Sequence, residues 1–257
     1  MAEEESIVLK PREPFSDALL PQSADELAKF MDQPLAAIAE TITGALAAGP
    51  KAWTLMTGHI VQGILQGKLY QQVSREIKEL RDKGKIPDDF ADEKKYKYGF
   101  KSWVDLLKTI DEKPPDSDLL EALMAMFYGA NKVNATDAQK MLSYRLLQIA
   151  RRLHSGELLL LRAIYDAFKR KDFQQQWVSL SVWTSKIAKL QGHNLTALVL
   201  KDEHALVEEE LISGYANAGT TDFNQSVLGN NARLSDLGIA FCQNIETYRV
   251  ETGPDSA

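Results

Sequence analysis

Two short runs in this 257-residue chain carry residue types that bind phosphate or metal ions. Residues 63–69, GILQGKL, resemble a phosphate-binding loop, but that loop needs four residues between its glycines and a Ser or Thr after its lysine. Asp202, Glu203 and His204 offer metal-binding atoms, yet no HExxH motif or second carboxylate–histidine pair accompanies them. We therefore predict no metal site and no cofactor, and we interpret residues 202–204 as a solvated helix face.

Nucleophilic chemistry is poorly supported as well. Cys242 is the one cysteine of the chain, which excludes an internal disulfide bond. A cysteine nucleophile needs a histidine beside it, and the four histidines, at 59, 154, 193 and 204, are scattered without such a spacing. We expect Cys242 to be a small buried hydrophobic residue. No catalytic residue is predicted, and a non-enzymatic protein is favoured over an enzyme whose site is assembled from scattered residues.

One cluster of basic and aromatic residues could bind single-stranded nucleic acid, because lysines attract phosphates and tyrosine rings stack on bases. The tyrosines are Tyr96 and Tyr98, and the lysines around them are Lys94, Lys95, Lys97 and Lys101. The alternative, which we favour, is a solvated polar connector over residues 84–98.

The overall composition describes a globular protein of mild acidity. Apolar residues make up 44% of the chain and charged residues 26%. The formal net charge of −6, from 30 Lys and Arg against 36 Asp and Glu, argues against tight non-specific binding of nucleic acid, which needs a positive surface. The acidic start MAEEES is unlike a secretion signal, so we expect a cytoplasmic protein.

The first third of the chain predicts an arm followed by helices. Residues 1–22 hold prolines and acidic residues without a sustained period and indicate a loosely ordered arm. Helices are expected over residues 23–32, 34–49 and 51–83, and the uncharged run at 52–67 contains a GxxxG spacing. A membrane-acting effector that uses residues 34–67 is therefore an alternative. We favour a buried helix, because the run is shorter than the roughly 20 residues that span a bilayer.

Residues 23–154 are predicted to form a helical domain that ends within a stretch of three helices, from Asp116 to Arg170. Asp116 is expected to cap the first of these helices, Asn134 or Thr136 the second, and Ser155 the third. Because the connection between the second and third helices is so short, we expect the parts on either side to pack as one rigid body. The first helix has its apolar residues at helical spacing: Leu119, Leu120, Leu123, Met126 and Phe127.

Residues 155–250 predict a winged helix-turn-helix-like module, followed by a tail at 251–257. The helix from 155 leads to a short apolar segment at 177–180, a helix capped by Ser181 and a second helix over 194–210. A strand at 210–215, a Gly/Asn/Thr-rich loop at 217–230, a short strand and a helix capped by Ser235 complete the order. This order, with its small β-hairpin, is typical of winged-helix domains, which serve many functions.

The helix over 194–210 would be the DNA-recognition helix of such a module. Asn194, Thr196 and Lys201 are the residues on it that could contact bases or phosphates. The same helix carries five acidic residues, and residues 155–257 hold nine Lys and Arg against thirteen Asp and Glu. Since acidic side chains are repelled by phosphates, a protein-contact role is at least as well supported as DNA binding.

The layout resembles the Abi-alpha group, bacterial proteins linked to phage defence. The resemblance spans most of residues 34–250 and is carried by four segments: PLAAIAETITGALAAGPKAWTLMTG, LLEALMAMF, SGELLLLRAIYDAF and LSDLGIAFCQNI. Where the group has an Asp-Pro or His-Pro-Ser stretch after the second segment, this chain has YGANKVNATDAQ. The resemblance implies a role in antiviral defence and supplies no catalytic residues.

Together these patterns predict a mainly α protein, with an N-terminal helical bundle followed by a winged helix-turn-helix-like module. We expect a non-enzymatic binding or regulatory protein of a bacterial antiviral system. It would act through protein contacts, with another protein or a second copy, and through DNA if the module binds it. Contact with a membrane is the alternative.

Overall fold

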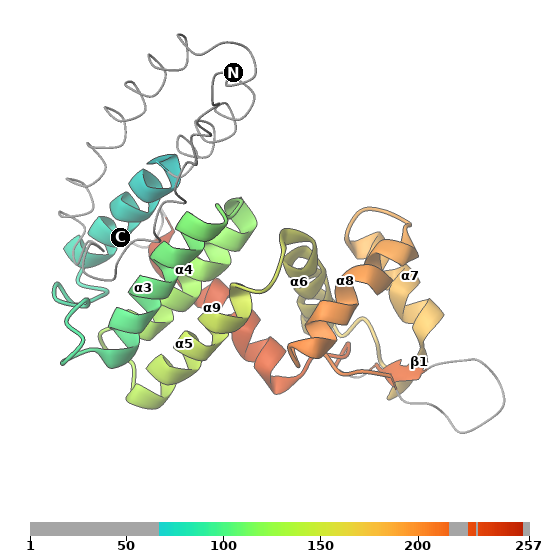
Figure 1. Cartoon of the computed structure of the whole chain (residues 1–257). Coiled ribbons are helices and arrows are strands. Elements are labelled where there is room, and N and C mark those ends of the chain that lie inside the picture. The colour runs from blue at the N-terminus through green and yellow to red at the C-terminus, as the bar shows by residue number, and fades with distance from the viewer. Residues whose placement is uncertain (1–66, 216–225, 230, 254–257) are drawn as a thin grey trace, which may run out of the picture.

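The computed structural model describes residues 67–215, 226–229 and 231–253, and in these ranges the chain is mainly helical, as predicted (Figure 1). The predicted arm, the predicted helices at 23–32 and 34–49, most of the loop at 217–230, and all but the last residue of the stretch at 34–67 that carries the membrane alternative lie outside these residues. No helix within the described ranges is long and apolar enough to cross a bilayer. The elements of the described chain are a helix over 67–82, α3 (Lys97–Glu112), α4 (Ser117–Asn131), α5 (Asp137–Ala150), α6 (Ser155–Lys169), β1 (Trp177–Ser179), α7 (Leu180–Leu190), α8 (Thr196–Glu208), β2 (Ser226–Leu228) and α9 (Asp236–Thr252).

The helix α4 lies at the centre of the N-terminal bundle, where it packs against α3, α5 and α9. It is buried on most sides, and all five of the apolar residues that we predicted to face inward are buried. Phe127 meets Phe90 edge to face, with ring centroids 5.6 Å apart, and Phe90 meets Trp103 in the same way at 5.8 Å. A helix that is apolar nearly all round is stable only inside other helices, so the bundle forms around α4.

Two predicted helix starts are confirmed at the atomic level. The Asp116 carboxylate accepts a hydrogen bond from the Leu119 amide at 3.1 Å and begins α4. Of the two candidates for α5, Thr136 is the cap, and it forms a capping box with Gln139. Such contacts satisfy amide groups that the first helical turn leaves without a partner.

Two other predicted caps are wrong. Ser155 is the first residue of α6 rather than its cap, because its hydroxyl donates a hydrogen bond to Asp116 and the residue before it, His154, takes the capping position. Ser181 lies inside α7, which begins at Leu180 and follows Ser179. The Ser155 hydroxyl therefore joins the start of α6 to the start of α4.

The last helix begins as predicted, since the Ser235 hydroxyl accepts from the Gly238 amide at 2.9 Å. Phe241 on this helix is fully buried, Leu237, Ile239 and Ile245 are partly buried against the core, and Cys242 is buried as predicted. Burial raises the pKa of the Cys242 thiol to about 12, which suits a packing residue and not a nucleophile.

The strands pair differently from the sequence prediction. β1 is antiparallel to β2, with Val178 opposite Val227, so the two strands enclose α7 and α8 in the sequence. The predicted strand at 210–215 contributes a single bridge, from Ile212 to Leu234. Beside this bridge the Ser213 amide donates to the Arg233 carbonyl at 2.7 Å, and the Ser213 carbonyl accepts from the Arg233 side chain.

α9 returns from the C-terminal elements to the N-terminal bundle and lies against both α4 and α6 (Figure 1). Carboxylates on α9 make the polar part of this contact. Glu246 accepts from the Tyr165 hydroxyl at 2.8 Å and from the Lys169 ammonium. Glu251 accepts from Lys132 at 2.5 Å and from the Tyr128 hydroxyl. One continuous core of buried side chains runs through both halves.

These carboxylates make the attachment of α9 sensitive to acid. Partial burial raises the pKa of Glu246 and Glu251, but hydrogen bonds from their lysine and tyrosine partners outweigh it and hold each pKa below the ordinary value of 4.5. A carboxyl with a pKa that is lower in the folded state stabilises the fold above its unfolded pKa, and this stabilisation is lost as the pH falls through the folded value.

We therefore expect the free energy of unfolding to fall as the pH is lowered below about 5, and to fall less steeply in the variant Glu246→Gln/Glu251→Gln. Urea denaturation followed by circular dichroism at a series of pH values measures both slopes. Glu93→Gln, an exchange at an exposed residue outside these contacts, is the matched control and should keep the wild-type slope. Equal slopes in the double variant and the wild type would contradict the assignment.

Candidate interaction surface

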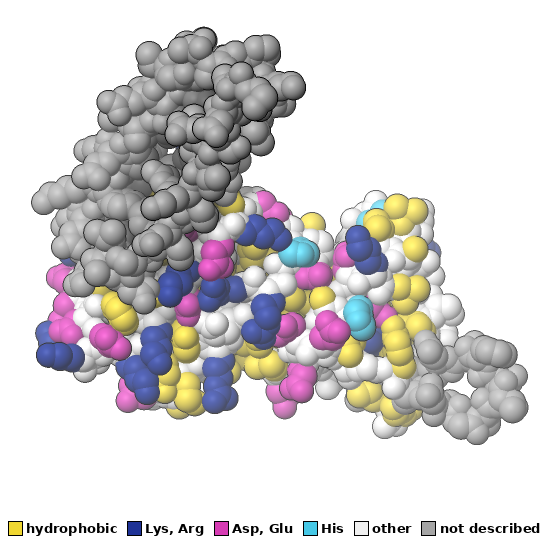
Figure 2. Space-filling model, viewed as in Figure 1, with side chains coloured by type: hydrophobic (Ala, Val, Ile, Leu, Met, Phe, Trp, Pro, Cys, Tyr) yellow, Lys and Arg dark blue, Asp and Glu magenta, His cyan; other side chains and the backbone are white. Residues whose placement is uncertain are grey.

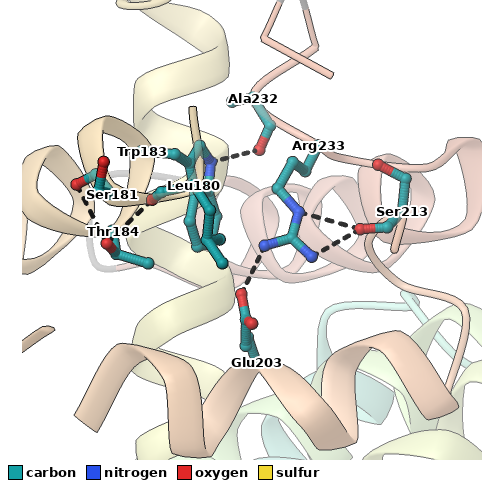
Figure 3. Close-up of polar contacts among 8 residues, drawn as sticks. All are labelled: Leu180, Ser181, Trp183, Thr184, Glu203, Ser213, Ala232 and Arg233. Atoms are coloured by element: carbon teal, nitrogen blue, oxygen red, sulfur yellow. Dashed lines mark hydrogen bonds and ion pairs between the residues drawn. The ribbon is translucent and has the colours of Figure 1, made fainter. Parts of the chain in front are cut away.

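An ion pair between Glu203 and Arg233 lies in the centre of the C-terminal elements (Figure 3). The Arg233 side chain is 0% exposed and donates from Nη1 to Oε2 of Glu203, which is 1% exposed. Its Nε and Nη2 both donate to the Ser213 carbonyl, at 2.9 and 2.7 Å. The prediction of a solvated face at residues 202–204 is therefore wrong for Glu203, because its partner lies 30 residues further along the chain.

Two aromatic rings enclose the Arg233 guanidinium. Its central carbon lies 4.4 Å from the ring centroid of Trp183 on α7 and 5.0 Å from that of Tyr215. The Trp183 indole also donates to the Ala232 carbonyl at 3.3 Å (Figure 3). A weakly hydrated, planar guanidinium stacks well on such rings, which a lysine ammonium would not do in the same geometry.

The backbone at Arg233 and at the residue before it is strained. Ala232 and Arg233 have φ values of 49° and 74°, in the left-handed region that residues other than glycine rarely occupy. Each such conformation costs on the order of 1–3 kcal/mol and persists where its surroundings hold it in place. Here the surroundings are the hydrogen bonds and ring contacts of Arg233 itself.

Burial acts on both charges of the pair. It raises the pKa of the Glu203 carboxyl and lowers the pKa of the Arg233 guanidinium, while the opposite charge of each partner works against the shift of the other. Within the described residues, Glu203 Oε1 and the Ser213 hydroxyl have no hydrogen-bond partner. The pair is thus maintained by one short contact between two desolvated ions, and the loss of either ion would leave the other uncompensated.

The pair fixes the orientation of α8, because Glu203 projects from that helix toward the strand and turn that carry Ser213 and Arg233. Val199 and Leu206 lie on the same buried face of α8. The opposite face is directed to solvent. The position of this exposed face is therefore set by the contacts of Glu203.

Leucines are exposed on the flanks of α8 and just before its start. Leu195 is 60% exposed, Leu198 43% and Leu200 42%, and Val182 on the neighbouring helix α7 is 55% exposed. Hydrophobic side chains are visible along the lobe that α7 and α8 form (Figure 2). We call the three leucines with Val182 the α8 surface. Exposed apolar side chains of this kind are unfavourable in water and are stabilised by contact with another apolar surface.

Charged residues on this helix are of mixed sign and mostly acidic. Lys201 is exposed, and His204 pairs with Glu208 at 3.3 Å one turn later. Asn194 is exposed and Thr196 is half-buried, so the three residues that we predicted to read DNA lie near one another at the start of α8. They supply a single formal positive charge, whereas a DNA-binding helix needs several to hold phosphates.

The second predicted nucleic-acid cluster lies at the far end of the molecule, where the chain enters α3 (Figure 1). Its lysines, Lys94, Lys95, Lys97 and Lys101, are exposed or half-buried. Lys95 pairs with Asp89 at 2.5 Å, and Tyr98 packs near Tyr144 with ring centroids 6.1 Å apart. These pairings occupy a lysine and a ring that nucleic acid would need. The structure does not bring the two predicted clusters together.

Sequence reasoning missed Arg233 and the α8 surface. Arg233 follows a loop and has no spacing that relates it to Glu203. The leucines could have been found, because Leu195, Leu198 and Leu200 fall at the start of a helix whose buried residues follow a different phase. No protein-family model, no curated protein and no solved structure matches this chain.

The variant Glu203→Gln removes the countercharge of a fully buried guanidinium, so we expect it to destabilise the protein by about 3–5 kcal/mol. The control Glu208→Gln changes an exposed glutamate of the same helix and should shift stability by no more than about 0.5 kcal/mol. Urea denaturation measures both. Hydrogen exchange should also show faster exchange of α8 amides in Glu203→Gln, and similar stability of the two variants would refute a structural role for the pair.

Proposed function

We propose that this chain is a non-enzymatic binding and regulatory protein with a winged-helix-like C-terminal module, and that it contacts another protein through the α8 surface. The module proposal is supported by the order α6, β1, α7, α8, β2, α9 and by the antiparallel pairing of β1 with β2 around the two central helices. In that arrangement α8 occupies the place of the recognition helix.

The observation that carries the proposal is the character of the exposed side of α8. A helix that reads DNA presents arginine, lysine, asparagine or glutamine to the major groove. Here Leu198 and Leu200 are exposed on the two flanks of the buried face of α8, and Leu195 precedes the helix. Leucines lose water favourably only against an apolar partner, by about 25 cal/mol for each Å² buried. The same helix position therefore suits a protein partner better than a nucleic acid.

The resemblance to the Abi-alpha group supports a setting in bacterial antiviral defence. Because that group supplies no catalytic residues, the resemblance is compatible with a role in binding. Plating of phage on cells with and without the gene tests this setting. The assay is independent of the surface through which the protein acts.

We expect a photoreactive benzoylphenylalanine at position 198 to crosslink to one discrete protein in the cells that produce this chain. Leu195→Asp/Leu200→Asp in the same chain should abolish the product, since charges in the apolar contact are costly to desolvate. The control position is 250, because Val250 is 74% exposed on α9, away from α7 and α8. The same products from both positions, or none from position 198, would contradict the proposal.

DNA binding is the second candidate, favoured by the place of α8 and by its exposed Asn194 and Lys201. On the charge argument we expect no saturable change in the anisotropy of a labelled 20-base-pair duplex at 50 mM salt, the condition that favours phosphate contacts most. Binding at 50 mM salt that weakens steeply at 150 mM and is lost in Lys201→Glu would establish DNA as the ligand instead.

A further inference from the structure

A pocket of about 160 Å³ lies where α4, α6 and α9 meet, away from the α8 surface. Its apolar lining includes Ala122 on α4, Leu158 on α6 and Ile245 on α9. Since one water molecule needs roughly 10–15 Å³ of such space, the pocket has room for a ligand of roughly ten non-hydrogen atoms. Sites between packed helices of this kind are common places for small ligands.

Most of the charges around the pocket neutralise one another. Arg249 on α9 forms a two-pronged contact with Glu121 on α4, through Nε and Nη2. Lys169 on α6 binds Glu246 on α9 and lies 3.7 Å from Asp166. These pairs join the three helices and hold the walls of the pocket in place. Arg249 and Glu121 cancel each other, whereas Lys169 faces two carboxylates, so these five residues together carry one net negative charge.

Two charged residues that line the pocket are unpaired. Asp118 on α4 and Arg162 on α6 have no hydrogen-bond or ion-pair partner among the described residues, although both line the same space. Arg162 is exposed and Asp118 half-buried, so each can reach a ligand, although the charge of Asp118 also acts on Arg249 and helps to raise its pKa. One free anion and one free cation from different helices therefore face an apolar floor.

We propose that this pocket binds a small zwitterion, an amino acid or dipeptide with an apolar body. Its carboxylate contacts the Arg162 guanidinium, its ammonium contacts the Asp118 carboxylate, and its hydrocarbon part lies on Ala122, Leu158 and Ile245. A guanidinium presents paired donors that match a carboxylate, and a carboxylate accepts readily from an ammonium. A ligand with only one charge would leave the other residue without a partner.

Binding of such a ligand would bridge α4 of the bundle and α6 of the C-terminal elements. The ligand would add a contact between two helices that already meet there, and so would stabilise the folded chain by an amount that grows with the logarithm of its concentration above Kd. The bridge would then couple the concentration of a small metabolite to the rigidity of the whole chain. This is a site for a regulatory ligand, since no described residue in it is paired as a nucleophile and base.

Isothermal titration of the full chain with L-leucine, 6-aminohexanoate and glycyl-L-leucine tests the proposal. These probes share a carboxylate, an ammonium and an apolar body, but differ in the distance between the charges. We expect saturable binding of at least one probe, and binding at least tenfold weaker in Arg162→Gln and in Asp118→Asn. N-acetyl-L-leucinamide, which has the leucine side chain and no charge, should not bind.

The matched control is Arg145→Gln, because Arg145 is an exposed arginine of α5 that does not line the pocket. It should bind the probe as the wild type does, and circular dichroism should show all three variants folded. The proposal is overturned if none of the probes binds at 10 mM, if the uncharged amide binds as well as a zwitterion, or if both pocket variants bind with wild-type affinity.

Discussion

The arrangement of the C-terminal half of this protein depends on the burial of one side chain, the guanidinium of Arg233. Arg233 has no access to water, so its charge must be balanced by Glu203, its donors by the Ser213 carbonyl, and its faces by the rings of Trp183 and Tyr215. These partners come from α7, α8 and the segment after α8. A buried polar network of this kind tolerates few alternative arrangements, because each would leave an ion unpaired in a medium of low dielectric constant. The network therefore determines the relative position of the two helices.

The helical bundle could be predicted from sequence because its signals are local. The apolar residues of α4 recur at helical spacing, and Asp116, Thr136 and Ser235 are capping residues at positions where helices do begin. The prediction failed at Ser155 for a reason that spacing cannot show. Its hydroxyl is hydrogen-bonded to Asp116, 39 residues earlier, so the residue before it became the cap. Local patterns predict elements, and distant side chains decide where some of them begin.

The candidate surfaces were harder to predict, because each depends on which face of a helix is covered. Glu203 lies between two other polar residues, so its sequence context predicts an exposed side chain. In the structure it is buried, because it pairs with Arg233, 30 residues later in the chain. With Val199, Glu203 and Leu206 on the core side of α8, the leucines at 198 and 200 lie at the two edges of that side and are partly exposed. The pocket between α4, α6 and α9 likewise combines Asp118 with Arg162, which have no relation in sequence. The charge argument against DNA binding stays a prediction, and it can be made from sequence because charge totals do not depend on the fold.

The return of α9 to the N-terminal bundle has a consequence for the order of events during synthesis. Tyr128 on α4 finds its partner, Glu251, 123 residues later in the chain. When α4 leaves the ribosome, the side of it that α9 will cover is still bare, and it stays so until almost all the described residues have been made. Contacts between residues so far apart also slow folding, because a long loop must close before they form. The bundle therefore has an interval as a nascent chain in which apolar surface is open, and a chaperone or an early interruption of translation would act on it then.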